Sequence, residues 1–120
     1  MILAYMAMAY FCMLHYVTQF VILKEKYMLF EWDEKKEKKN IIAHGIDFNT
    51  ALLVFGDDNR IEKYDRKHSI YEDRYITIGE IGDMIAVIMV VYTERNEIIR
   101  IISARPATKL EKEAYYYGKS

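Results

Sequence analysis

The chain is 120 residues long, 52% hydrophobic and 29% charged, with a formal net charge of −1. Its length and the lack of a Pro/Gly/Ser-rich linker predict a single compact domain, without room for a second core. The lone Cys12 excludes an internal disulfide framework and a cysteine-based zinc site, and it suits a reducing, cytoplasmic location. A charge so close to zero excludes general attraction to nucleic acid, so phosphate binding would need a local patch.

The first 23 residues carry no charged side chain, and the segment is long enough to cross a bilayer as a helix. Polar side chains at mid-depth and the lack of a preceding Lys or Arg argue against a span, and no signal-peptide cleavage site follows. We therefore expect residues 1–27 to be an apolar, helix-like extension to a domain of residues 28–120. It could be an upstream extension from a mis-assigned start codon, with Met28 as the alternative start, a membrane anchor, or a partner-docking or self-associating helix.

Residues 28–59 are predicted to form a strand followed by two helices. Residues 28–33 alternate between apolar and polar side chains, which is typical of a strand. Asp33 is placed to cap a helix over residues 34–44, with Gly45 at its C′ position. Asp47 is a second N-cap candidate. The apolar spacing of a short helix follows it, at Phe48, Ala51, Leu52 and Phe55.

The period then changes from helical to strand-like. Residues 60–64 form a weak, polar strand suited to a sheet edge, and 65–73 a charged loop. Residues 74–79 alternate as a half-buried strand, whereas 84–93 are almost continuously apolar and should be central. With a last strand over 98–104, short connections predict an antiparallel meander.

A C-terminal helix is predicted for residues 107–117, after the only proline, Pro106. Thr108 is its expected N-cap and Glu111 stands at N3, the spacing of a capping box. The fold class is therefore α+β, with two N-terminal helices, an antiparallel sheet and a C-terminal helix.

Short motifs are distributed along residues 28 to 117. In chain order they are Phe30-Glu31-Trp32-Asp33, Asn40, His44-Gly45, Phe48, Ala51, Asp73-Arg74-Tyr75, Ile78-Gly79, Tyr92-Thr93, Arg100-Ile101-Ile102-Ser103-Ala104-Arg105, Ala107-Thr108, Glu111 and Tyr115. No single motif is decisive, but their order and spacing together resemble the BrnT toxins. Chains of that family usually begin at or just before the Phe-Glu-Trp-Asp motif, so the apolar extension departs from the pattern.

The BrnT resemblance implies a toxin of a type II toxin–antitoxin system with a RelE-like fold. It implies an endoribonuclease that cleaves mRNA, either free or at the ribosome, and inhibits translation. It also implies a BrnA-like antitoxin, a ribbon-helix-helix DNA-binding protein that neutralises the toxin and represses the shared operon with it. The alternative is a catalytically silent partner, kept only as a co-repressor with that antitoxin.

Metal-independent RNA cleavage needs a deprotonated 2′-hydroxyl, a stabilised phosphate and a protonated 5′-oxygen. We assign stabilisation of the phosphate to Arg74, Arg100 and Arg105, because a guanidinium fork can hold two phosphate oxygens. Arg74 and Arg100 could instead lock the fold by pairing with Glu31, Asp33 or Asp73. Regular alternation sends Arg100 and Arg105 to opposite faces, so they share a site only if Pro106 or a bulge re-aims the strand end.

The choice of acid and base is open. Glu72 or Asp73 could act as the base, while Lys109, Tyr92 and Tyr115 could protonate the leaving group or hold the phosphate. His68 is either an RNA-contacting group or an ordinary surface histidine. His15, His44 and His68 lie too far apart in the sequence to resemble a metal cluster, so we expect no metal and no cofactor.

Two aromatic features have both a binding and a structural interpretation. Trp32 could stack on a nucleobase or fill the core between the first strand and helix. In the run Tyr115-Tyr116-Tyr117, one ring should rest on the sheet and others should serve an antitoxin interface. His44, next to Gly45, is assigned a structural role at the end of its helix.

Overall fold

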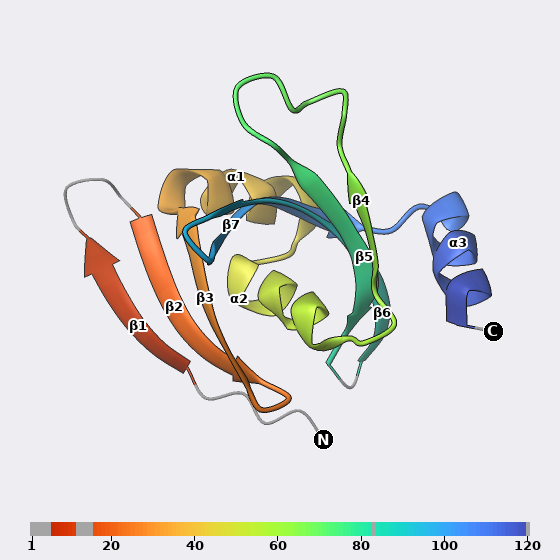
Figure 1. Cartoon of the computed structure of the whole chain (residues 1–120), viewed down its shortest axis with the longest axis horizontal. Helices are drawn as coiled ribbons and strands as arrows, with labels where there is room; N and C mark the ends of the chain where they lie inside the picture. Colours follow the sequence, from red (N-terminus) through yellow and green to blue (C-terminus); the bar gives the residue numbers. More distant parts are fainter. Residues whose placement is uncertain (1–5, 12–15, 83, 120) are drawn as a thin grey trace.

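The fold is a curved sheet of seven strands, seen in a computed structural model that describes residues 6–11, 16–82 and 84–119 (Figure 1). The strands are β1 (Met6–Phe11), β2 (Tyr16–Leu23), β3 (Lys26–Asp33), β4 (Ile61–Tyr64), β5 (Tyr75–Ile81), β6 (Met84–Arg95) and β7 (Ile98–Pro106). Their spatial order is β1-β2-β3-β7-β6-β5-β4. The helices are α1 (Glu34–His44), α2 (Phe48–Ala51), the 3₁₀ helix η1 (Leu52–Gly56) and α3 (Lys109–Lys119). The predicted α+β class is confirmed.

The sheet is mixed, so the prediction of a purely antiparallel sheet is wrong. Strands β4 to β7 form the expected antiparallel meander, with β4 at the edge and β6 inside. However, β7 also pairs with β3 in parallel, through residues 98–100. A parallel pair needs a long connection between its strands, and the whole chain from α1 to β6 supplies one here.

The helix-like extension is also wrong for every part of it that the structure describes. Residues 6–11 and 16–23 are strands β1 and β2, and β2 pairs with β3 along its whole length. The buried side chains of β2 alternate, and they are Val17, Gln19, Val21 and Leu23. The strand conformation of β2 therefore depends on a two-residue burial period and on pairing with β3, and the high hydropathy of the segment does not make it a helix.

The remaining parts of the extension, residues 1–5 and 12–15, lie outside the described residues, and Cys12 and His15 lie among them. None of the helices in the described ranges is long and apolar enough to cross a membrane. The predicted domain boundary between residues 27 and 28 falls within β3, and it stays a prediction.

The helix ends follow their local sequence, as predicted. The Asp33 carboxylate accepts a hydrogen bond from the Lys35 backbone N–H at 2.8 Å, and Gly45 ends α1 with φ of 70°. The Asp47 carboxylate accepts from the Thr50 N–H at 2.7 Å. At the start of α3, Thr108 and Glu111 form the expected reciprocal capping box.

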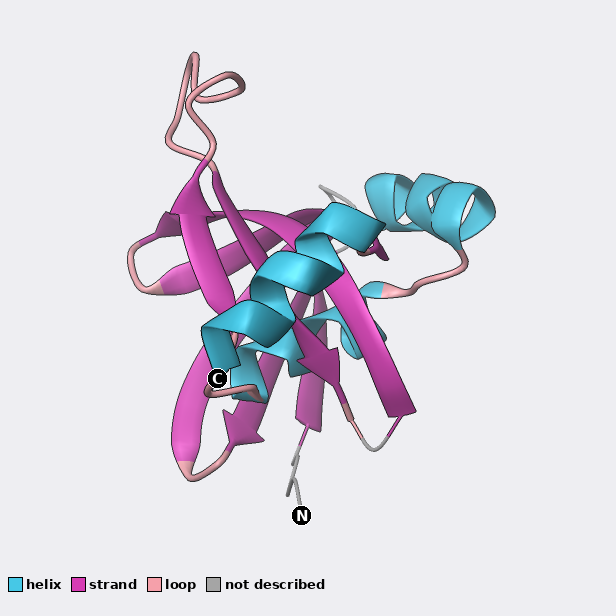
Figure 2. Ribbon diagram, turned by 90° about the vertical axis from the view of Figure 1, so that its right-hand side faces the viewer, coloured by secondary structure: helices cyan, strands magenta, loops and turns pink. Residues whose placement is uncertain are grey.

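Two cores lie on the two faces of the sheet. The larger one is covered by α2 and η1, which lie on the concave side in Figure 1, and it includes Phe30, Trp32 and Phe48, all fully buried. On the other face, α3 crosses the strands (Figure 2), and its Tyr115 packs with Ile78, Val87 and Met89 of β5 and β6. We call this second surface the α3 face. Only part of it is covered by the helix.

Candidate active site

The three predicted arginines all belong to the α3 face. Arg100 pairs with Thr93 of β6 and Arg105 pairs with Met89. Residues 89 and 93 are four apart on β6, so their partners share a face. Five residues separate Arg100 from Arg105, and the odd number is absorbed by an irregularity between Val91 and Tyr92. This bulge fulfils the condition under which both arginines could reach one surface.

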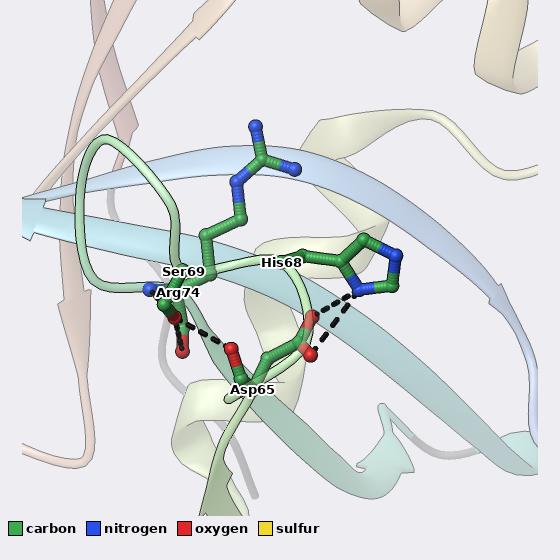
Figure 3. Close-up of polar contacts among 4 residues, drawn as sticks. All are labelled: Asp65, His68, Ser69 and Arg74. Atoms are coloured by element: carbon green, nitrogen blue, oxygen red, sulfur yellow. Dashed lines mark hydrogen bonds and ion pairs between the residues drawn. The ribbon is translucent and has the colours of Figure 1, made fainter.

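Arg74 immediately precedes β5. Tyr75 pairs with Tyr92, so continuing this register by one residue places Arg74 opposite Thr93. Because neighbouring strands lie about 4.8 Å apart, we expect the backbones of Arg74 and Arg100 to be about 10 Å apart across β6. Within the described part of the chain, the Arg74 guanidinium makes no hydrogen bond or ion pair. Figure 3 shows its side chain extended away from the Asp65 carboxylate.

The loop that leads into Arg74 is closed by its own backbone. The Asp65 N–H donates to the Arg74 carbonyl at 2.9 Å. The Ser69 hydroxyl donates to the Asp65 carbonyl at 2.5 Å and accepts from the Arg74 N–H at 2.9 Å (Figure 3). These contacts fix the position from which the Arg74 side chain projects. Sequence reasoning missed Asp65 and Ser69, although Asp and Ser are the residue types that close such turns.

His68 is held in the same loop by Asp65. Its Nδ1 lies 2.9 Å from an Asp65 carboxylate oxygen, while the imidazole side chain is 58% exposed (Figure 3). The Asp65 side chain is only 10% exposed, so it is the fixed member of the pair. A carboxylate that orients one ring nitrogen leaves the other directed toward solvent, as proton-transferring histidines require.

The two predicted bases already have partners. Glu72 receives hydrogen bonds from the Arg95 guanidinium, through Nε at 2.9 Å and also through Nη2. Asp73 is exposed, and its carboxylate accepts a hydrogen bond from the Tyr64 hydroxyl at 3.0 Å. Both carboxylates lie next to Arg74 in the chain. Asp73 is the more accessible of the two.

Arg100 has the fold-locking environment considered from the sequence. Its Nε donates to Glu31 on β3 at 3.0 Å, and its Nη1 donates to the Tyr16 hydroxyl on β2 at 3.1 Å. The guanidinium carbon also lies 4.4 Å from the centre of the Tyr16 ring. Arg100 thus ties β7 to both β3 and β2, and only 22% of its side chain is exposed.

Arg105 is paired as well. Its guanidinium donates two hydrogen bonds to the Glu111 carboxylate, at 2.7 and 3.0 Å, and a third to the Pro106 carbonyl. Glu111 also accepts from the Thr108 N–H in the capping box. Arg105 therefore joins the end of β7 to the first turn of α3, and 32% of its side chain remains exposed.

This arrangement predicts a pH dependence of stability. Hydrogen bonds from Arg105, followed by that from the Thr108 N–H, hold the pKa of Glu111 below its usual 4.5. A carboxyl whose pKa is lower in the folded state stabilises above its unfolded pKa, and that stabilisation is lost as pH falls through the folded pKa. Urea unfolding at pH 7 and pH 3 should therefore show a smaller loss of stability for Glu111→Gln than for the native chain. Equal losses would contradict this assignment.

Three aromatic residues assigned to RNA contact are buried. Trp32 is fully buried, packs edge-on against Phe48 and donates to Glu37 at 3.2 Å, so its ring is not presented to a base. Tyr92 and Tyr115 are also buried, with 6% and 0% of their surface exposed. This burial raises the pKa of both phenols. These RNA-contact assignments are corrected, because a residue that fills the core cannot also face the substrate. Lys109 is exposed at the start of α3.

A basic groove that sequence reasoning did not assign lies between α1 and β7. It measures about 250 Å³ and is lined by Lys36, Lys39, Asn40, Ala43, His44, Ile102 and Ser103. The signal was present in the lysine-rich helix, but only the fold shows which lysines face β7. A larger pocket of about 610 Å³ lies at the β2–β3 turn and η1. Of the three cations that line it, Lys24 and Arg60 are paired with Asp58 and Glu62, whereas Lys26 forms no ion pair with a described residue.

Comparison with known families identifies the family of the chain. The family described as "Ribonuclease toxin, BrnT, of type II toxin-antitoxin system" matches residues 32–111. This range runs from the end of β3 through Glu111 and includes the whole loop of Asp65 and Arg74. No curated protein matches the chain. The match confirms the resemblance, and the chain belongs to the BrnT family of ribonuclease toxins of type II toxin–antitoxin systems.

Proposed function

We propose that this protein is a RelE-like, metal-independent endoribonuclease that cleaves mRNA in the cytoplasm and so inhibits translation. The observation that supports it is the 65–74 loop. This loop presents the Arg74 guanidinium, which has no partner among the described residues, together with the imidazole that Asp65 orients. An unpaired cation and an exposed, oriented histidine match two needs of phosphodiester cleavage.

The proposed reaction is an internal transfer at phosphorus. The RNA 2′-oxygen attacks the adjacent phosphorus and forms a P–O2′ bond, while the P–O5′ bond breaks. His68 or the accessible Asp73 takes the 2′-hydroxyl proton, and the leaving 5′-oxygen receives a proton from solvent or a neighbouring acid. Arg74 holds the non-bridging oxygens as their charge grows. The products are a 2′,3′-cyclic phosphate and a free 5′-hydroxyl.

Arg100 and Arg105 have a supporting role in this scheme. Each is held by a carboxylate, and each joins strands or a strand and a helix below the loop. They maintain the sheet from which Arg74 projects, and their charge is balanced by Glu31 and Glu111. Lys109 adds a further exposed positive charge at the start of α3.

We assign neutralisation to a BrnA-like ribbon-helix-helix antitoxin that covers this face. Ile70 and Tyr71, at the tip of the 65–74 loop, are 76% and 99% exposed. Exposed apolar side chains next to a charged site suit a protein interface, since burying them on binding is favourable. Operator DNA would be contacted only through the antitoxin.

Induced expression of the full chain in bacteria tests this function. Growth arrest with mRNA cleavage is expected, and co-expression of a BrnA-like antitoxin should restore growth. The rival, a catalytically silent co-repressor, is favoured by the carboxylate pairing of two of the three arginines. Unimpaired growth with a soluble, cooperatively folding product would reject the nuclease and leave the co-repressor as the remaining candidate.

A further inference from the structure

The groove between α1 and β7 has an unbalanced positive charge. On α1, Glu34 pairs with Lys38 at 3.7 Å, and Glu37 is occupied by Trp32 and by the Phe48 N–H. Lys36 and Lys39 are exposed, and neither forms an ion pair with a described residue. Two lysines without counter-ions that line the same small groove give it a local positive charge, which favours an anionic ligand.

The groove has fixed walls. The side chain of Asn40 donates to the Ala104 carbonyl at 2.8 Å and accepts from the Ala104 N–H at 3.0 Å, so it fastens α1 to the part of β7 beyond its pairing with β3. It also donates to the Ile46 carbonyl at 2.9 Å. Asn40 is therefore a structural wall, and the groups that remain for a ligand are Lys36, Lys39, His44 and the Ser103 hydroxyl.

The floor of the groove is continuous with the candidate active site. Ser103 pairs with Val91 of β6, midway between the Thr93–Arg100 and Met89–Arg105 pairs. Val91 in turn pairs with Ile76 of β5, two residues after Arg74. Ile76, Val91, Ile102 and Ser103 are all only partly buried. A half-exposed strip thus crosses the sheet from the Arg74 loop to the α1 lysines.

Accepting the nuclease function proposed above, we infer that this groove binds the sugar–phosphate backbone of single-stranded RNA on one side of the cleaved phosphate. Its volume, about 250 Å³, is below the roughly 300–1,000 Å³ of pockets that enclose drug-sized ligands. Such a groove suits a phosphate and its ribose, with the base outside. Lys36 and Lys39 neutralise the phosphate, and the Ser103 hydroxyl and His44 provide polar contacts.

The test compares two double variants of α1 that remove the same charge. Lys36→Ala/Lys39→Ala removes the groove lysines, whereas Lys35→Ala/Lys38→Ala removes two exposed lysines that do not line it. Binding of a labelled, single-stranded 2′-O-methyl RNA is measured by fluorescence anisotropy over a range of salt concentrations. Because this RNA cannot be cleaved by 2′-attack, binding is read separately from activity.

The groove variant should bind at least about tenfold more weakly, with a salt slope reduced by about 0.7 for each lysine. The control should lose much less. Equal losses in both variants would overturn the inference, because general charge would then explain them. Unchanged RNA affinity in the groove variant, with weaker binding of the antitoxin, would overturn it in favour of a protein-docking groove.

The two proposals can fail separately. If the native chain cleaves ordinary RNA while the groove variant binds normally, the groove inference is rejected and the nuclease stands. If the native chain binds RNA through the groove lysines but cleaves none, the nuclease is rejected and the groove stands.

Discussion

Replacing Arg74 with alanine is expected to lower the rate of RNA cleavage by about 10²–10³-fold, the usual effect of removing a group that stabilises transition-state charge. Stability should change by less than about 0.5 kcal/mol, because the guanidinium has no partner among the described residues that would be lost. The measurement is single-turnover cleavage together with urea unfolding. Arg74→Lys should also be impaired, since an ammonium cannot hold two phosphate oxygens in a fork.

Arg66→Ala provides the matched control for Arg74. Arg66 is an exposed arginine of the same loop, outside the strand row that contains Thr93 and Arg100. Both substitutions remove one positive charge from one loop, so a general electrostatic effect would lower both activities alike. Full activity of Arg74→Ala would contradict the proposed mechanism, because that mechanism depends on the Arg74 guanidinium.

Val21→Asp should destabilise the protein by more than about 3 kcal/mol, because it places an unpaired carboxylate in the core. Val21 is fully buried on β2, between Met28 of β3 and the edge strand β1. Folded domains are stable by only about 5–15 kcal/mol, so the loss should be evident in chemical denaturation. The neighbouring Ile22→Asp is the control, since Ile22 faces the other way opposite the exposed Tyr27.

A normal stability of Val21→Asp would mean that β2 is not part of the folded core. The same packing predicts that a chain beginning at Met28 loses the strand partner of β3 and the cover that Val17, Val21 and Leu23 give to the core. Functional experiments are therefore designed with the full chain.

Helix ends could be predicted because they depend on near neighbours. The Asp33 and Asp47 caps, Gly45 and the Thr108–Glu111 box all act within a few residues of the sequence. The N-terminal strands could not be predicted in this way. Apolar residues occupy both faces of β2, which hides the two-residue period, and only the pairing with β3 resolves it.

The site was predicted in its residue types more than in its contacts. The loop position of His68 follows from the sequence, whereas Arg74, predicted as the first residue of a strand, lies one residue before β5. The bulge that aligns Arg100 with Arg105 depends on the pairing of β7 with β6, and no local pattern marks it. Glu31 and Arg100 are 69 residues apart, so only the fold could decide between ion pairing and catalysis. The same holds for Trp32, whose burial depends on Phe48.

The most direct test of the ribonuclease account compares two substrates that differ by one oxygen atom. The purified full chain is incubated in EDTA with a single-stranded RNA, and with the same oligonucleotide carrying a 2′-deoxynucleotide at the cleaved position. We predict cleavage of the RNA to a 2′,3′-cyclic phosphate and a 5′-hydroxyl, and none at the deoxy position. Cleavage of both substrates at equal rates, or of neither, would contradict the mechanism.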